Sequence, residues 1–146
     1  MSNLRNNWKL QEVLNLFDKS FNELLFDAHE IHIANHKKDM VQVCTLLSIK
    51  TGGCPEDCGY CSQSIHSEDP IEATPLMSLE EVKKHVKQAR DQGSTRFCMG
   101  AAWRRPSNQN IDRVIKMVEI VHDLGMESCV TLGMLSEDQA IRLSKS

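Results

Sequence analysis

The most restrictive feature of this sequence is an alternation of strand-like and helix-like segments at a nearly constant spacing. Residues 95–100 and 126–132 are short and apolar, as strands are, and their starts lie about 31 residues apart. Helical apolar spacing fills the interval, and Gly93 and Gly125 end the helical patterns that precede the two strands. Because a strand–helix–strand unit takes about 30 residues or more, this alternation predicts a parallel α/β sheet.

An earlier strand is expected at residues 41–49, where the sequence Val-Gln-Val-Cys-Thr-Leu-Leu-Ser-Ile is β-branched and almost continuously apolar. Such a run is typical of a strand buried on both faces. Cys44 lies inside this strand with no partner motif, so we interpret it as a packing residue.

The first forty residues have a helical pattern instead. Apolar residues at helical spacing predict one helix over residues 8–17, and Ser20 with Glu23 forms a capping box that opens a second helix. We therefore expect a helical N-terminal extension over residues 1–40 and an α/β part over residues 41–146.

Chain length limits how much of an α/β fold is present. A closed (β/α) barrel takes about 250 residues, whereas this chain has 146 residues and accommodates three predicted strands. A three-stranded parallel sheet would leave unpaired edges. We therefore expect the first three βα units of a longer (β/α) barrel, incomplete at the C-terminus; a small, complete open sheet is the alternative.

Composition restricts the function classes. The formal net charge is −3, without the basic excess typical of nucleic-acid binding. No apolar run approaches the length of a membrane span, and the N-terminus has no pattern of a secretory signal or transit peptide. We therefore expect a cytoplasmic protein without nucleic-acid or membrane partners, in which six cysteines serve metal or redox chemistry rather than disulfides.

Three of these cysteines follow the first predicted strand in a loop of about 27 residues, a length that usually signals function or disorder. Cys54, Cys58 and Cys61 have the spacing Cys-x3-Cys-x2-Cys, and thiolates favour zinc or iron–sulfur clusters. Structural zinc requires four ligands, whereas three thiolates can hold a [4Fe–4S] cluster and leave one iron open. A zinc site with His66 as fourth ligand remains the alternative.

The cysteine spacing, with Tyr60 before the last cysteine, resembles the signature of the radical S-adenosylmethionine enzymes, which use partial or complete (β/α) barrels. The surrounding words resemble the biotin synthase family over nearly the whole chain. These words are Leu-Leu-Ser-Ile-Lys-Thr-Gly (46–52), Cys-Pro-Glu-Asp-Cys (54–58), Ser-Thr-Arg-Phe-Cys-Met-Gly-Ala-Ala-Trp (94–103) and Thr-Leu-Gly (131–133).

The resemblance implies a sulfur-inserting enzyme that converts dethiobiotin to biotin through a 5′-deoxyadenosyl radical. It implies that Cys54, Cys58 and Cys61 hold a [4Fe–4S] cluster that binds S-adenosylmethionine, and that Tyr60 lies at this cofactor. A cofactor is needed because acid–base residues cannot break unactivated C–H bonds. A flavodoxin-type or ferredoxin-type electron donor and a homodimer of the full-length protein are expected partners. The alternatives are another radical S-adenosylmethionine enzyme and a non-catalytic iron–sulfur or zinc module.

Two further cysteines lie in the later strands. Side chains alternate along a strand, so Arg96 and Cys98 share one face of the second strand, and Cys129 shares a face of the third with Glu127 and Thr131. These mixed faces suggest a lined cavity, although a free cysteine is often simply a small buried hydrophobe. The resemblance implies that Cys98 and Cys129 are ligands of a [2Fe–2S] cluster whose other ligands lie beyond Ser146. The isolated 146-residue chain is then expected to be inactive.

Other residues invite a functional interpretation with less support. Among them Arg96 is the strongest candidate for a functional residue, because an inward-facing guanidinium needs an anionic partner or a cluster. The histidines 29, 32 and 36 share a helical face but are expected to be solvated, as is the loop 103–106. Glu56 and Asp57 are adjacent in the cysteine loop and are not interpreted as an acid–base pair.

Overall fold

The computed structural model describes residues 5–146. Its internal contacts divide the chain into two compact units, one extending to Val41 and the other spanning Gln42–Ser146. Each unit is described by itself.

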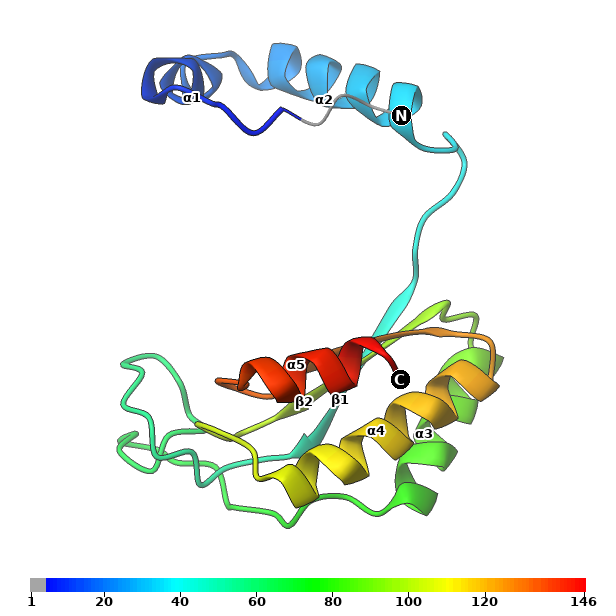
Figure 1. Ribbon diagram of the computed structural model, residues 1–146. Coiled ribbons are helices and arrows are strands. Elements are labelled where there is room, and N and C mark those ends of the chain that lie inside the picture. The colour runs from blue at the N-terminus through cyan, green and yellow to red at the C-terminus, as the bar shows by residue number, and fades with distance from the viewer. Residues whose placement is uncertain (1–4) are drawn as a thin grey trace. The chain divides into compact units, whose positions relative to one another are not determined.

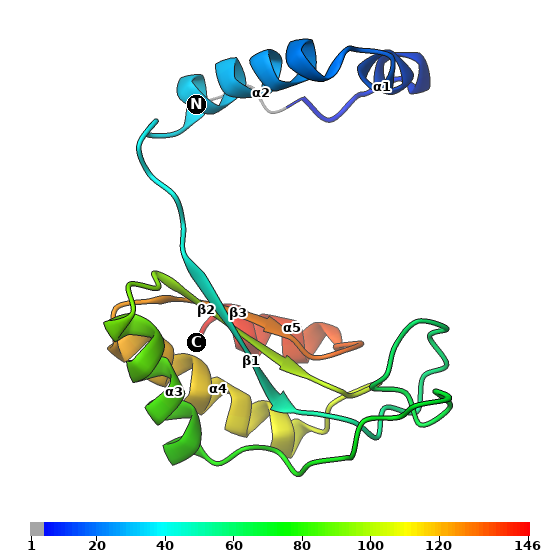
Figure 2. The same ribbon diagram turned by 180° about the vertical axis from the view of Figure 1, so that it is seen from behind.

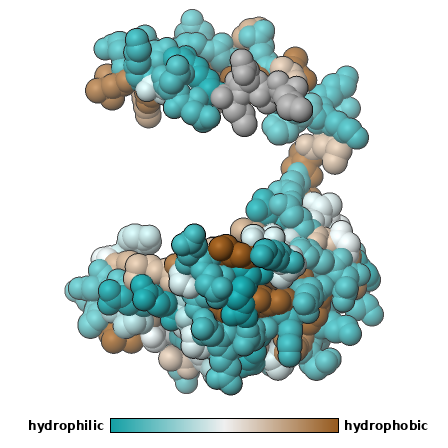
Figure 3. Space-filling view, in the orientation of Figure 1, coloured by the Kyte–Doolittle hydropathy of each residue, from teal (hydrophilic) through white to brown (hydrophobic). Residues whose placement is uncertain are grey.

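The first unit consists of two helices, α1 (Leu10–Phe17) and α2 (Phe21–Asn35). The helical prediction is confirmed, and the Ser20 side chain accepts a hydrogen bond from the backbone N–H of Glu23, as a capping box requires. Neither helix buries a residue fully. In Figure 3 separate apolar side chains lie among hydrophilic ones on this unit.

The second unit is a parallel α/β sheet, as predicted. Its strands pair in the order β1-β2-β3, and both pairs are parallel. Helices α3 and α4 lie side by side along the sheet (Figures 1 and 2). The elements are β1 (Cys44–Lys50), α3 (Leu79–Asp91), β2 (Arg96–Ala101), α4 (Asn108–Asp123), β3 (Glu127–Thr131) and α5 (Glu137–Ser144).

Local sequence signals define where these helices begin and end. Serines 78, 107 and 136 each accept a hydrogen bond at a helix start, and serines 78 and 136 form capping boxes with Glu81 and Gln139. Gly93 and Gly125 follow α3 and α4 with φ of 91° and 75°, a conformation that favours glycine. The helix boundaries are therefore determined by local interactions, namely N-cap hydrogen bonds at the starts and glycines in the left-handed conformation after the ends.

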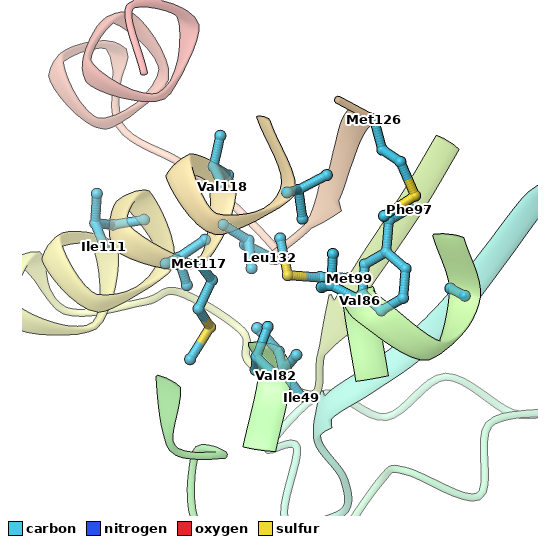
Figure 4. Close-up of a cluster of buried hydrophobic side chains, with 13 residues drawn as sticks. Ile49, Val82, Val86, Phe97, Met99, Ile111, Met117, Val118, Met126 and Leu132 are labelled. Carbon is cyan, nitrogen blue, oxygen red and sulfur yellow. The ribbon is translucent and has the colours of Figure 1, made fainter. Parts of the chain in front are cut away.

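The core lies between the two helices and one face of the sheet (Figure 4). Full burial of an apolar side chain such as Phe97 stabilises the folded state by about 1.5–3 kcal/mol relative to leaving it exposed. The labelled core side chains come from β1 and β2, from α3 and α4, and from the residues that flank β3: Ile49, Val82, Val86, Phe97, Met99, Ile111, Met117, Val118, Met126 and Leu132.

The prediction that the first strand is buried on both faces is wrong. Along β1 the side chains of Thr45, Leu47 and Ile49 are half-buried or buried, whereas Cys44, Leu46 and Ser48 are exposed. The helices pack on the first set, and within residues 5–146 the second set lies on an open face of the sheet. The candidate metal-binding side chains of the strands lie on that open face.

Among residues 5–146, every helix is too short or too polar to span a bilayer.

Candidate metal-binding sites

The cysteine loop leaves the carboxyl end of β1 and extends past the edge of the sheet (Figure 2). Its first turn depends on Gly52, which has φ of 62°. A Cβ atom at this position would lie 2.4 Å from the carbonyl oxygen of Ile71, so no larger residue fits without movement. The backbone N–H of Gly52 also donates to the Gln63 side chain. The turn at Gly52 therefore connects the start of the loop to residues 63 and 71, which lie later in the same loop.

Ser64 organises the middle of the loop. Cys54 and Ser64 form an isolated parallel β-bridge, and the backbone N–H of Ile65 donates to the Cys54 carbonyl at 3.0 Å. The Ser64 hydroxyl, buried to 2% exposure, donates to the carbonyl of Glu56 and accepts from the N–H of His66. The sequence analysis did not identify Ser64, because no local sequence pattern indicates a β-bridge between residues ten positions apart, such as Cys54 and Ser64.

The loop surrounds a cavity of about 480 Å³. Cys58, Cys61 and His66 line it, together with Tyr60, whose side chain is 95% exposed. The Cys61 N–H donates to the Cys58 carbonyl at 2.9 Å, so these two thiols are held on one tight turn. The donor set suits a soft metal or an iron–sulfur cluster.

The thiols are not assembled into a centre in this structure. Within residues 5–146, no three His, Cys, Asp or Glu side chains are grouped closely enough to hold a metal ion. Binding at the loop would therefore have to draw Cys54, Cys58 and Cys61 together. His29 and His36 are exposed, His32 is half-buried, and the rings of His32 and His36 stack.

Glu56 pairs with Arg104 rather than with its neighbour Asp57. The Arg104 Nε atom lies 2.8 Å from Glu56 Oε1, which connects the cysteine loop to the loop after β2. The sequence interpretation left residues 103–106 as a solvated loop, but Trp103 packs against the core. This segment therefore supports the cysteine loop.

The second group of thiols lies on the open face of the sheet. Cys98 of β2 is directly opposite Cys129 of β3 in the strand register. Cys44 of β1 is opposite Arg96, one step along the same face, and its Sγ atom lies 3.2 Å from that of Cys98. Three thiols from three neighbouring strands thus gather on one face.

Arg96 lies among these thiols. Its Nη2 atom lies 3.8 Å from Glu127 Oε1, and its Nη1 donates to Gln42 at 3.3 Å. A hydrogen bond to Cys129, followed by the charge of Glu127, raises the pKa of Arg96. Its Nε atom is buried and has no hydrogen-bond partner. An orphaned donor beside thiols fits a site that receives an anionic group.

Burial shapes the acidity of the central thiol. Desolvation, followed by hydrogen bonding to Cys44 and Cys129, raises the pKa of Cys98 to about 12. In the metal-free chain Cys98 therefore keeps its proton at neutral pH. A metal at this site would have to displace that proton.

The interpretation of Cys44 as a packing residue is wrong. Cys44 is exposed, and it belongs to the thiol group rather than to the core. The signal was present in the sequence, because Cys44, Leu46 and Ser48 alternate with the more apolar face of the strand. The nearly continuous apolar run concealed that alternation.

A cavity of about 370 Å³ lies over the same face. Leu46, Ser48, Gly100 and Thr131 line it from the three strands, and Gln63 lines it from the cysteine loop. Its lining thus reaches from the open face of the strands to the loop at the carboxyl ends of the strands, where parallel α/β proteins bind ligands.

These features define a class of protein: a parallel α/β protein with thiol-rich sites on its open face and at its carboxyl edge. Comparison with known proteins makes the class more specific. The chain is 55% identical over 143 residues to a biotin synthase of Thioalkalivibrio sulfidiphilus, covering 98% of this chain and 42% of that protein. It is 53% identical over 141 residues to a biotin synthase of Novosphingobium aromaticivorans, covering 97% of this chain and 40% of that protein.

A biotin synthase of Vesicomyosocius okutanii is 53% identical over 145 residues, which cover 99% of this chain and 45% of the relative. The relationship to biotin synthases is therefore confirmed, and the chain corresponds in sequence to a portion of one. It spans about 42% of the length of these relatives. No known family profile matches the chain.

Proposed function

We propose that this chain forms part of a biotin synthase that inserts sulfur into dethiobiotin by radical S-adenosylmethionine chemistry. One observation carries the proposal: a Cys-x3-Cys-x2-Cys loop follows the first strand of a parallel sheet, in a chain 55% identical to a biotin synthase. In the whole protein we expect the sheet to continue into a (β/α) barrel.

Cys54, Cys58 and Cys61 are proposed to hold a [4Fe–4S] cluster. When bound, the cluster supplies one electron to S-adenosylmethionine and splits its sulfonium bond. Gly52 and Ser64 fix the loop backbone, so the chain restricts where its thiols can go. Tyr60 is exposed at the rim of the 480 Å³ loop cavity, which is a suitable position for contact with the cofactor.

Cys98 and Cys129 are proposed to hold part of a [2Fe–2S] cluster that provides the sulfur. They face each other across β2 and β3, and the buried Nε of Arg96 offers a hydrogen-bond donor to an anionic group. The 370 Å³ cavity on the same face of the sheet is proposed to admit dethiobiotin, because its lining reaches from the strands to the cysteine loop.

The remaining parts of the proposal concern the whole protein. A reduced flavodoxin-type or ferredoxin-type protein would deliver the electron, and the full-length enzyme would be a homodimer. The six free thiols suit a cytoplasmic location, because a reducing compartment preserves them.

A second candidate is a zinc or non-catalytic iron–sulfur module. His66 favours it, because this side chain lines the same cavity as Cys58 and Cys61 and provides a fourth ligand type. The third candidate is another radical S-adenosylmethionine enzyme with a different substrate.

A chimera tests the proposed function. Residues 1–146 would replace the matching segment of the Thioalkalivibrio sulfidiphilus biotin synthase, and biotin formation from dethiobiotin would be measured in a biotin-requiring bacterium. The chimera is expected to restore growth, whereas its Cys58→Ala variant and the isolated 146-residue chain should not. A folded chimera that binds iron but forms no biotin would contradict the proposal.

A further inference from the structure

Gln63 is a residue of the cysteine loop to which the proposed function assigns no role. It lies between Cys61 and Ser64 and is half-buried. Its side-chain Oε1 atom accepts a hydrogen bond from the backbone N–H of Gly52 at 2.5 Å, and its carbonyl oxygen accepts one from the N–H of Cys54 at 3.0 Å. One residue therefore holds two positions at the start of the cysteine loop.

The contact with Gly52 determines how the side-chain amide of Gln63 is oriented. A backbone N–H can only donate, so the oxygen of the amide must face Gly52 and its NH2 group must face another partner. Within residues 5–146, the bond from Gly52 is the only hydrogen bond that this side chain forms. The NH2 group thus retains its donors for a further partner.

Gln63 also lines the cavity of about 370 Å³ on the open face of the sheet. The other lining residues have an apolar side chain, a hydroxyl or no side chain: Leu46, Ser48, Gly100, Ala101, Ala102 and Thr131. Among these described residues Gln63 has the only side-chain amide, and a donor in a largely apolar lining favours an oxygen acceptor. The cavity therefore suits a molecule that combines apolar groups with a carbonyl or carboxylate oxygen.

The contacts of Gln63 couple this cavity to Cys54. Gly52 has φ of 62°, and a Cβ there would lie 2.4 Å from the carbonyl oxygen of Ile71, so the backbone of this turn has little room to move. A ligand that accepts from the NH2 group of Gln63 fixes the side chain in the orientation that also binds Gly52. Because coupling between two contacts is reciprocal, filling the cavity stabilises the turn, and an ordered turn favours filling of the cavity.

We propose that Gln63 is a positioning residue that joins the open-face cavity to the first cysteine of the loop. Its two oxygens hold Gly52 and Cys54, and its NH2 group donates to an oxygen acceptor of the molecule in the cavity. The proposal rests on the proposed function for the identity of that molecule, since dethiobiotin offers both a urea carbonyl and a carboxylate. The hold on Gly52 and Cys54 does not depend on that identity.

Two substitutions separate the contacts. Gln63→Met keeps the length of the side chain but removes its oxygen and its NH2 group, whereas Gln63→Glu keeps an oxygen that can accept from Gly52 and removes the donors. Amide hydrogen exchange would be followed by NMR in the isotope-labelled, metal-free chain. In Gln63→Met the Gly52 amide should exchange about threefold to tenfold faster, because it loses its hydrogen bond, and exchange at Cys54 should also accelerate. In Gln63→Glu both amides should keep the parent rates.

Dethiobiotin binding tests the contact with the ligand, in the chimera that also tests the proposed function. Gln63→Glu should weaken binding at least about fivefold in isothermal titration calorimetry, because a donor is replaced by a carboxylate that repels an oxygen acceptor. In the parent chimera dethiobiotin should slow amide exchange of the peptide that contains Gly52 and Cys54, measured by mass spectrometry. In Gln63→Glu it should not.

Ser62→Ala is the matched control, since Ser62 is the exposed neighbour of Gln63 and its hydroxyl forms no hydrogen bond within residues 5–146. It should leave exchange and binding unchanged. Exchange of Gly52 at the parent rate in Gln63→Met, or equal dethiobiotin binding by Gln63→Glu and its parent, would overturn the proposal. A folded parent chimera that binds no dethiobiotin would instead contradict the proposed function, and the exchange experiment would still decide whether Gln63 holds Gly52 and Cys54.

Discussion

The Sγ atoms of Cys44 and Cys98 lie 3.2 Å apart on neighbouring parallel strands, although the two residues are 54 positions apart in the chain. The contact exists because β1 and β2 pair in a register that aligns Leu46 with Cys98 and places Cys44 one step back on the same face. Cys129 of β3 lies opposite Cys98, so all three strands place a thiol on the open face of the sheet. The cysteine loop and this surface are separate sites, and the cavity on the open face is lined by the strands and by Gln63 of the loop.

The turn at Gly52 should be essential for the loop. Gly52→Ala places a Cβ against the Ile71 carbonyl and forces a residue other than glycine to φ of 62°. We expect a loss of about 1–3 kcal/mol in the free energy of unfolding, measured by urea titration, and weaker iron uptake. Gly59→Ala is the control, because a Cβ at Gly59 meets nothing within 4 Å. Equal effects of the two substitutions would exclude the strained turn as the cause.

The thiol of Cys98 should be unreactive in the metal-free chain. Its pKa is raised to about 12, so at neutral pH far less thiolate is present than for a thiol near 9.0. Iodoacetamide should therefore alkylate Cys98 at least about tenfold more slowly in the folded chain than in urea, as measured by peptide mass spectrometry.

The same shift has a consequence for stability. As pH rises from 9.0 toward about 12, the unfolded chain loses the Cys98 proton before the folded chain does. The raised pKa therefore stabilises the folded state fully below pH 9.0, and this contribution is lost across that window. Urea midpoints should fall with pH more steeply for the wild-type chain than for Cys98→Ala. Parallel pH profiles would contradict the pKa shift.

The two sites should be separable by substitution. In the chimera, Cys98→Ala or Cys129→Ala should abolish the absorption of the second cluster and biotin formation, because each removes a thiolate from the strand face. Cleavage of S-adenosylmethionine under strong reduction should persist, since the loop thiols are untouched. Biotin formation at the unsubstituted rate would show that these thiols only pack.

Much of the fold could be predicted from the sequence, because its signals are local. The capping boxes at Ser78 and Ser136 and the glycines at 93 and 125 determine helix ends within a few residues, and the structure confirms them. The parallel order of the strands followed from the lengths of the connections.

What could not be predicted depends on contacts between distant segments. The bridge between Cys54 and Ser64 and the ion pair of Arg104 with Glu56 require the folded loop, and no periodicity marks them. Cys44 was misinterpreted because its burial depends on which face of β1 the helices cover, not on the hydrophobicity of the strand.

Iron and sulfide counts test the central claim most directly. The 146-residue chain with Cys98 and Cys129 replaced by alanine would be reconstituted anaerobically with iron and sulfide, and both elements would be measured per chain. We expect about four irons with about as many labile sulfides, and almost none after the further substitution Cys58→Ala. One equivalent of zinc without labile sulfide, or iron binding that survives Cys58→Ala, would contradict the assignment of the loop to a [4Fe–4S] cluster.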